Sequence, residues 1–424
     1  MVQVVEDVEI IERVAALDIG KAEVVCCVRV PDESRSGRGA GRGQHVRTFA
    51  TMTRSLTDLS DWLTGLRVTR VVMEATSDYW KPPFYLLEAA GFDVWLVNAH
   101  EVKHLPGRPK TDALDAVWPC KIAERQMIRA SFVPPAPIRQ LRDLTRYRID
   151  LIGDRGREKN RVEKLPEDAG IKLSVVASDL FGVSGRAMMD ALIAGERDPD
   201  ILADLARTRL RARIPELREA LTGHFTDHHG FLLSQMLRHV DHLDGRIAAV
   251  EAQIEDHIRP YADTVARLDQ IPGIGPAAAG MTIAEIGIDM TRFPTAAHLA
   301  SWAKFSPTVK ESAGKTKGSA ATGRGNRYLA RALGEAAVGA SRTNTFLGER
   351  YRRVARRRGK QRALVAIGRS ILTVIWHLLS DPDATFNDLG ADHYDNRGST
   401  QRGLRRHVNA LHALGFTVTI TPTG

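Results

Sequence analysis

The sequence predicts a mixed α/β domain at the N-terminus, followed by a region that is mainly helical. In the first 130 residues, short apolar runs of strand length alternate with segments whose leucines recur at helical spacing. From residue 138 onward, apolar side chains recur every three or four positions, which is the spacing of helices. We therefore expect an α/β domain over 12–130, a helical or coiled-coil region over 137–262 and a mainly helical domain over 263–380. The tail over 381–424 looks irregular, with a possible final strand at 416–422 and no assignable role.

Five strands are expected in the N-terminal domain. Their patterns lie, in chain order, at 14–20, 23–30, 45–52, 69–76 and 92–98. Helical patterns follow the third strand at 55–66 and the fourth strand at 80–91, and a further helix follows the fifth strand. A flexible segment rich in Gly and Arg, 31–44, joins the second and third strands. The order β-β-β-α-β-α-β-α is that of a ribonuclease H-like domain, in which the ends of the first and fourth strands lie side by side.

Each of those two strands ends in an acid, Asp18 in "ALDIG" and Glu74 in "VVMEAT". Two more acids, Asp112 and Asp115, lie three residues apart in "KTDALDA", a spacing that costs a plain helix about 0.2–0.5 kcal/mol. Four gathered carboxylates cannot all stay ionised without cations, so we expect two Mg²⁺ ions, about 3.5–4 Å apart, at this point. Taken singly, Asp18 would be a turn former and Glu74 a surface acid.

The helical region contains a long Arg-rich helix over 138–165 and a poorly defined stretch around 166–200. A heptad pattern follows and ends before Pro260. Its apolar positions are Leu233, Met236, Val240, Leu243, Ile247, Val250 and Ile254. This seam fits a dimer interface and one strip of an ordinary helical bundle equally well.

The stretch "LDQIPGIGPAAAGMTIAEIG" (268–287) has the form of a helix-hairpin-helix. Gly273 and Gly275 permit a tight turn, and the free N–H groups at the start of the second helix can bind a phosphate. An ordinary turn between two helices would give a similar pattern.

The net charge of +9 points to a polyanionic partner. Basic residues concentrate at 139–164 and at 350–369, where a phosphate-binding surface is favoured over a merely solvated helix face. No uninterrupted apolar stretch has transmembrane length, since the nearest, 363–379, carries Arg369. Three cysteines without zinc spacing indicate reduced thiols, and we expect a cytoplasmic protein with no membrane partner.

The motifs "ALDIGK", "VVMEAT" and "KTDALDA", together with "IPGIGP" and the segments 300–333 and 359–376, make the chain resemble transposases of the insertion-sequence 110 family. These are DEDD-type recombinases guided by a bridge RNA, and the resemblance covers about residues 12–380. It implies that Asp18, Glu74, Asp112 and Asp115 form a RuvC-like acidic tetrad that holds Mg²⁺.

The resemblance also implies a catalytic serine upstream of "RGNRYLAR". We assign it to Ser312 in "KESAGKTKG", with Ser319 and Ser306 as alternatives because Ala313 separates Ser312 from Gly314. The serine would attack a DNA phosphate and form a covalent phosphoserine intermediate. Basic and polar residues around both motifs are expected to contact nucleic acid: Arg108, Lys110, Lys310, Lys315, Lys317, Arg324, Asn326, Arg327 and Arg331.

The partners that the resemblance implies are donor and target DNA, a structured guide RNA, and further copies of the chain in a homodimer that assembles to a tetramer. In the RNA-guided mechanism, base pairing supplies sequence specificity and the protein binds shape and backbone. Two other functions compete with this one. A RuvC-like endonuclease would use the same acids to activate water and leave Ser312 inert, and a nucleic-acid-binding protein would have no catalytic activity.

Overall fold

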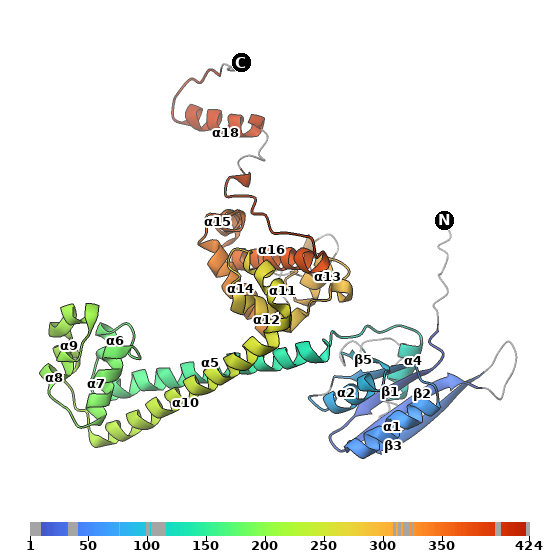
Figure 1. The fold of residues 1–424 in the computed structure, drawn as a ribbon. Helices are drawn as coiled ribbons and strands as arrows, with labels where there is room; N and C mark the ends of the chain where they lie inside the picture. The colour runs from blue at the N-terminus through green and yellow to red at the C-terminus, as the bar shows by residue number, and fades with distance from the viewer. Residues whose placement is uncertain are drawn as a thin grey trace. The chain divides into compact units, whose positions relative to one another are not determined.

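The computed structural model divides the chain into two compact units, Met1–Val133 and Pro134–Gly424 (Figure 1). The described residues are 10–32, 41–75, 77–98, 102, 116–307, 311–312, 315–316, 323, 325–394 and 400–420.

The N-terminal unit contains a five-stranded mixed sheet in the order β3-β2-β1-β4-β5. Its strands are β1 (Val14–Ile19), β2 (Glu23–Pro31), β3 (Arg42–Ala50), β4 (Arg70–Glu74) and β5 (Asp93–Val97). The first three strands pair antiparallel, whereas β4 lies parallel to both β1 and β5. The expectation of an α/β sheet followed by a helical region is confirmed, and the strand order is consistent with a ribonuclease H-like domain.

Helices cover both faces of this sheet. On one face, the leucines of α1 (Thr53–Gly65) and the apolar residues of α2 (Lys81–Ala89) pack against the sheet. Their partners there include Leu17 of β1 and Met73 of β4. On the other face, α4 (Val117–Glu124) packs against β1, β2 and β4. Cys26 and Cys27 point to opposite faces, as their adjacent positions in a strand require.

The second unit contains two long helices, α5 (Ala136–Asp168) and α10 (Asp227–Ile258), which pack against each other. The pair is antiparallel, because Arg148 contacts Glu251 whereas Arg155, further along α5, contacts the earlier residue Asp244. Leu243 and Ile247 of the predicted heptad seam are buried with Leu151 of α5. The bundle alternative therefore accounts for these seam residues, which contact a helix of the same chain.

A small helical layer with its own core lies where α5 ends and α10 begins (Figure 1). The predicted undefined stretch is largely helical, because Met188, Met189 and Leu192 recur at helical spacing and pack against Leu233 and Leu237 of α10. The helices are α6 (Leu173–Val176), α7 (Val183–Ile193), α8 (Pro199–Asp204) and α9 (Ile214–Ala220).

The C-terminal helices surround α16 (Lys360–Ser380), which contacts α11, α13, α14 and α15. Their bounds are α11 (Ala262–Asp269), α12 (Pro276–Ile286), α13 (Ala296–Trp302), α14 (Arg327–Ser341) and α15 (Phe346–Arg358). Among the described residues α16 alone is long and apolar enough to cross a membrane. Three of its apolar residues, Ile367, Ile371 and Ile375, are fully buried among the neighbouring helices.

The tail differs from its prediction. Residues 400–413 form a helix, α18, and the expected final strand is absent from the described residues 416–420. Phe416 and Ile420 are exposed there, so this segment has neither the ladder partner nor the buried face that would hold a strand.

The turn between α11 and α12 depends on Gly273. Its φ of +90° is in the left-handed region, and a Cβ atom would lie 2.1 Å from the carbonyl oxygen of Ala336 in α14. The turn thus joins α11 to α12, and the helix-hairpin-helix itself stays a prediction. The phosphate contact predicted for Gly273 and Gly275 remains a prediction.

Replacing Gly273 by Ala is expected to lower the free energy of unfolding by about 2–4 kcal/mol, through both backbone strain and the clash with α14. Gly275→Ala is the matched control, since nothing lies within 4 Å of the position that its Cβ would take and the change costs less than about 1 kcal/mol at a helix N-cap. Urea unfolding followed by helical circular dichroism measures both. Equal losses in the two variants would contradict the close-packing account.

Candidate active site

Asp18 and Glu74 come together through the parallel pairing of β1 with β4. In that register Val14 lies opposite Arg70 and Leu17 opposite Met73, so the next residue on each strand is one of the two acids. Adjacent strands lie about 4.8 Å apart, which places the two acids at neighbouring positions on the sheet edge. Asp18 is exposed and Glu74 is partly exposed.

Both carboxylates belong to the face that α4 covers. Side chains alternate along a strand, and Ala16 and Val72, two residues before the acids, lie in the core beneath α4. The intervening residues, Leu17 and Met73, belong to the opposite core. The two acids are therefore on one face, as a shared site requires.

The direction of α4 brings its N-terminal end toward these acids. The backbone N–H of Ile11 donates to the carbonyl of Glu124 at the C-terminal end of α4 at 2.9 Å, and Cys120 Sγ lies 3.5 Å from the carbonyl of Val14. The helix thus runs opposite to β1, and its first residue, Val117, is two positions after Asp115 in the sequence. Asp112 and Asp115 themselves, with Arg108 and Lys110, lie outside the described residues.

Glu124, which the sequence did not single out, fixes the other end of α4. Its buried carboxylate accepts one hydrogen bond from Arg29 of β2 at 2.5 Å and contacts Arg42 of β3 at 3.0 Å. Burial raises the pKa of the neighbouring Cys120 thiol, and that of Cys26, so these cysteines are protonated core residues.

The donors at this edge suit a hard cation. Carboxylate oxygens are the ligands that Mg²⁺ prefers, and Asp18 and Glu74 supply them from adjacent strand ends. The described residues contain no group of three or more Asp, Glu, His or Cys side chains that could hold a metal. Any larger ligand set must therefore draw on residues outside the described ones.

The segment with the predicted serine begins as a short hairpin. Strand β6 (Glu311–Ser312) pairs antiparallel with β7 (Lys315–Thr316), and Ser312 lies opposite Lys315. The described residue Ser306 lies outside this hairpin, whereas Lys310, Lys317, Ser319 and Arg324 lie outside the described residues.

Asn326 closes this segment by capping α14. Its side-chain oxygen accepts hydrogen bonds from the N–H groups of Tyr328 at 3.0 Å and Leu329 at 3.2 Å. The amide nitrogen of the same side chain donates to a carboxylate oxygen of Glu285 in α12. The nucleic-acid contact predicted for Asn326 remains a prediction, and in the structure this side chain caps α14 and contacts Glu285.

Glu285 is the centre of a buried network that the sequence did not reveal. Its carboxylate has no exposed surface and accepts two hydrogen bonds of 2.8 Å from the fork of Arg146 in α5. Arg142, one turn earlier, donates to the carbonyls of Ala284 and Glu285 at 2.9 and 2.8 Å. Burial opposes the charge of Arg146 most strongly, but the hydrogen bonds to Glu285, together with the attraction of Glu285 and other nearby acidic groups, outweigh it and raise the pKa of that guanidinium.

Two further predicted contacts, Arg327 and Arg331, lie on the exposed side of α14. Arg327 is 3.6 Å from Asp150, and Arg331 forms an (i, i+4) pair with Glu335 at 2.9 Å. Exposed pairs of this kind contribute about 0–1 kcal/mol, so phosphates can displace these acids.

The basic run of α15 and the start of α16 forms an exposed surface, the arginine ridge. Within the described part of the chain, its members have no acidic partner. They are Arg356, Arg357, Arg358, Lys360 and Arg362.

Comparison with known proteins gives two matching family models. Residues 15–167 match a transposase model of the DEDD type named for IS110, and residues 265–352 match the transposase IS116/IS110/IS902 family. A probable family 20 transposase of Pseudomonas aeruginosa is 26% identical over 348 residues, which is 81% of this chain and 92% of that protein. An uncharacterized 43.6 kDa protein of insertion element IS110 from Streptomyces coelicolor is 36% identical over 135 residues, 31% of this chain and 33% of that protein.

Replacing Glu285 by Ala is expected to destabilise the protein by about 3–5 kcal/mol, because it leaves the charge of Arg146 without its partner. Glu335→Ala removes an exposed partner of Arg331 and should cost less than about 1 kcal/mol. Denaturant unfolding of the two variants compares them directly. A small effect at Glu285 would mean that the network does not hold α5, α12 and α14 together.

Proposed function

Because the chain belongs to the IS110 family of transposases, we propose that it is a recombinase that excises and inserts a mobile element by serine attack on DNA phosphates. The family implies a DNA-processing enzyme with a DNA substrate. The observation that carries the proposal is the register of β1 and β4, since it supports a shared role for Asp18 and Glu74. The proposed domains are those expected from the sequence: 12–130, 137–262, 263–380 and a tail over 381–424.

In this proposal Asp18, Glu74, Asp112 and Asp115 hold two Mg²⁺ ions. The two described acids fit the ions because both present hard oxygen donors on one face. Bound Mg²⁺ would stabilise the charge that develops on the phosphate oxygens. The parallel strands keep the two carboxylates at a fixed spacing, and Arg108 and Lys110 bind neighbouring phosphates.

Ser312 is the proposed nucleophile. The bond from its Oγ to phosphorus forms as the bond from phosphorus to O3′ breaks, which leaves a phosphoserine and a free 3′ hydroxyl. The serine proton passes to solvent or to a basic group such as Lys310, Lys315 or Lys317, and O3′ takes up a proton. The Glu285–Asn326 contact supports this role by fixing the point where the serine segment joins α14.

The proposal includes a structured guide RNA that supplies sequence specificity. The arginine ridge supports it, since clustered exposed cations bind nucleic-acid backbones through counterion release. Gly273, Gly275, Arg324, Asn326, Arg327 and Arg331 are the other proposed nucleic-acid contacts. A homodimer that assembles to a tetramer would bring the two halves of the site together across subunits. The proposed location is the cytoplasm.

Asp18→Asn is expected to lower Mg²⁺-dependent cleavage of the element's DNA ends by at least about a hundredfold, since metal stabilisation is worth several kcal/mol. Cleavage is measured on end-labelled DNA with the guide RNA present, and EDTA should give the same loss. Asp61→Asn changes an exposed acid of α1 in the same unit and should retain full activity. Metal-independent cleavage by Asp18→Asn would refute the site.

A covalent protein–DNA adduct is expected in cells that carry the gene with its flanking DNA, after lysis under denaturing conditions. Ser312→Ala should abolish the adduct, whereas Ser306→Ala should retain it. DNA breaks without an adduct, lost in Asp18→Asn but not in Ser312→Ala, would instead identify a RuvC-like endonuclease that activates water. Binding without any cleavage would identify a protein that only binds nucleic acid.

A further inference from the structure

The segment 381–394, which follows α16, folds back over α15 and is held there by specific contacts. Arg267 of α11 donates to the carbonyls of Asp381 at 2.7 Å and Ala384 at 2.9 Å. Asp388 accepts hydrogen bonds from the N–H groups of Phe346, the first residue of α15, at 3.1 Å and of Gly390 at 3.2 Å. The first part of the tail therefore packs as a fixed part of the C-terminal unit.

Tyr394 anchors the end of this segment. Its ring stacks on Phe346 with centroids 5.3 Å apart and planes inclined by 18°, and the guanidinium of Arg353 lies 4.6 Å from the ring centroid. The Tyr394 hydroxyl accepts a hydrogen bond from Arg350 at 3.1 Å. Three residues of α15 thus contact Tyr394. These contacts fix the orientation of the Phe346 ring and of the Arg350 guanidinium.

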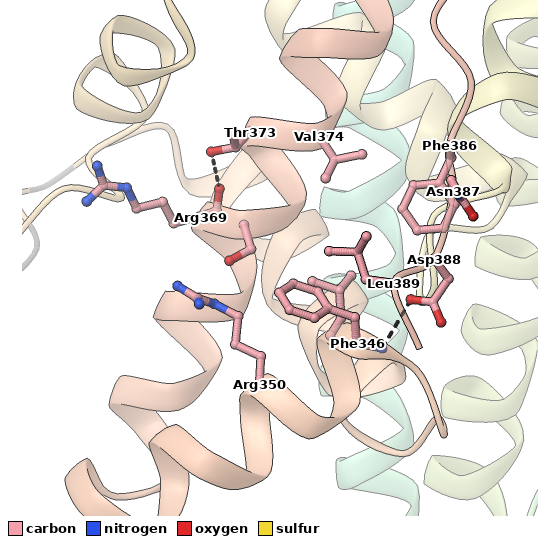
Figure 2. A pocket seen from close by; sticks show the side chains of 11 residues that line it. Phe346, Arg350, Arg369, Thr373, Val374, Phe386, Asn387, Asp388 and Leu389 are labelled. Atoms are coloured by element: carbon pink, nitrogen blue, oxygen red, sulfur yellow. Dashed lines mark hydrogen bonds between the residues drawn. The ribbon is translucent and has the colours of Figure 1, made fainter. Parts of the chain in front are cut away.

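Between α15, α16 and this segment lies an open pocket of about 380 Å³. Figure 2 shows the guanidinium groups of Arg350 and Arg369 on one side of it and the apolar side chains of Phe386 and Leu389 on the other. Phe346 and Val374 continue the apolar lining. The pocket therefore combines aromatic and aliphatic side chains with two cations.

The lining contains two arginines and one acid, so its formal charge is positive. Both oxygens of Asp388, the acid that lines it, accept backbone hydrogen bonds. Arg369 is exposed, and Nε of Arg350 is buried without a hydrogen-bond partner in the described part of the chain. An anion in the pocket would lie beside two guanidinium groups, which stabilise it through charge-assisted hydrogen bonds.

We propose that this pocket binds one unpaired nucleotide of a single strand, with the base against Phe346 and Leu389 and its phosphate at Arg350 and Arg369. The inference rests on the proposed function as a nucleic-acid enzyme. Bases that are not paired are recognised by stacking on aromatic side chains and on Arg, whereas a base within a duplex must first be unstacked. The arginine ridge belongs to the same two helices, α15 and α16, and offers further cations for phosphates.

The test is equilibrium binding of the full-length protein to a labelled oligouridylate, the matching oligothymidylate and a duplex DNA, followed by fluorescence anisotropy. Arg369→Gln and Leu389→Glu change the pocket, and Arg357→Gln changes the ridge; each lowers the net charge by the same amount. Both pocket residues are exposed, so folding is retained and is checked by circular dichroism. We expect each pocket variant to bind single strands about tenfold more weakly than the unchanged protein. For the duplex, the loss of affinity in the pocket variants should be small and equal to that of Arg357→Gln.

A 4-thiouridine oligonucleotide should crosslink to peptides that contain Phe346 or Phe386. Preference for the RNA or the DNA strand identifies which single strand supplies the nucleotide. Equal loss in pocket and ridge variants for single strands would overturn the proposal, as would full competition by inorganic phosphate at constant ionic strength. Because the assay measures binding and not cleavage, it tests the pocket even if the catalytic proposal fails.

Discussion

The charge of one buried carboxylate constrains the whole C-terminal unit. Glu285 has no exposed surface, and its carboxylate is paired there by the fork of Arg146 and the amide of Asn326. These partners come from α5 and from the start of α14, so satisfying one charge fixes three helices at once. The segment with Ser312 ends at that same asparagine, so its end is held by hydrogen bonds to Glu285 and to the first N–H groups of α14.

In the N-terminal unit the corresponding constraint is the register of β1 against β4. The pairing of β1 with β4 sets both the neighbourhood and the face of Asp18 and Glu74. A slip of one residue would turn one of the acids into the core beneath α1 and α2. Burial of the strands on both faces opposes this slip, because Leu17 or Met73 would leave its core and a carboxylate would take its place there.

The sequence predicted these strands and the pairing of Asp18 with Glu74 because alternating apolar runs and their chain order determine a sheet of this kind. It could not predict the partner of the heptad seam, since a dimer and an internal helix pair have the same period. Glu285 left a weaker signal: a single acid in the apolar run "MTIAEIGI", far from two arginines spaced one turn apart in α5. Joining them requires the tertiary structure. The segment 381–394 has no periodicity at all, because isolated hydrogen bonds and one stacked ring hold it.

The antiparallel pair of α5 and α10 also acts as a ruler. Arg146, bound to the Glu285 network, and Val162, in the core of the small helical layer, are separated along α5 by about 24 Å at the rise of an α-helix. One inserted residue would lengthen this distance by about 1.5 Å and rotate everything beyond it by about 100°. A change of length in α5 would also have to be matched in α10. Both the distance between the two cores and their rotation about the axis of α5 are therefore fixed. A change that keeps the rotation requires insertions of whole turns in α5 and α10 together.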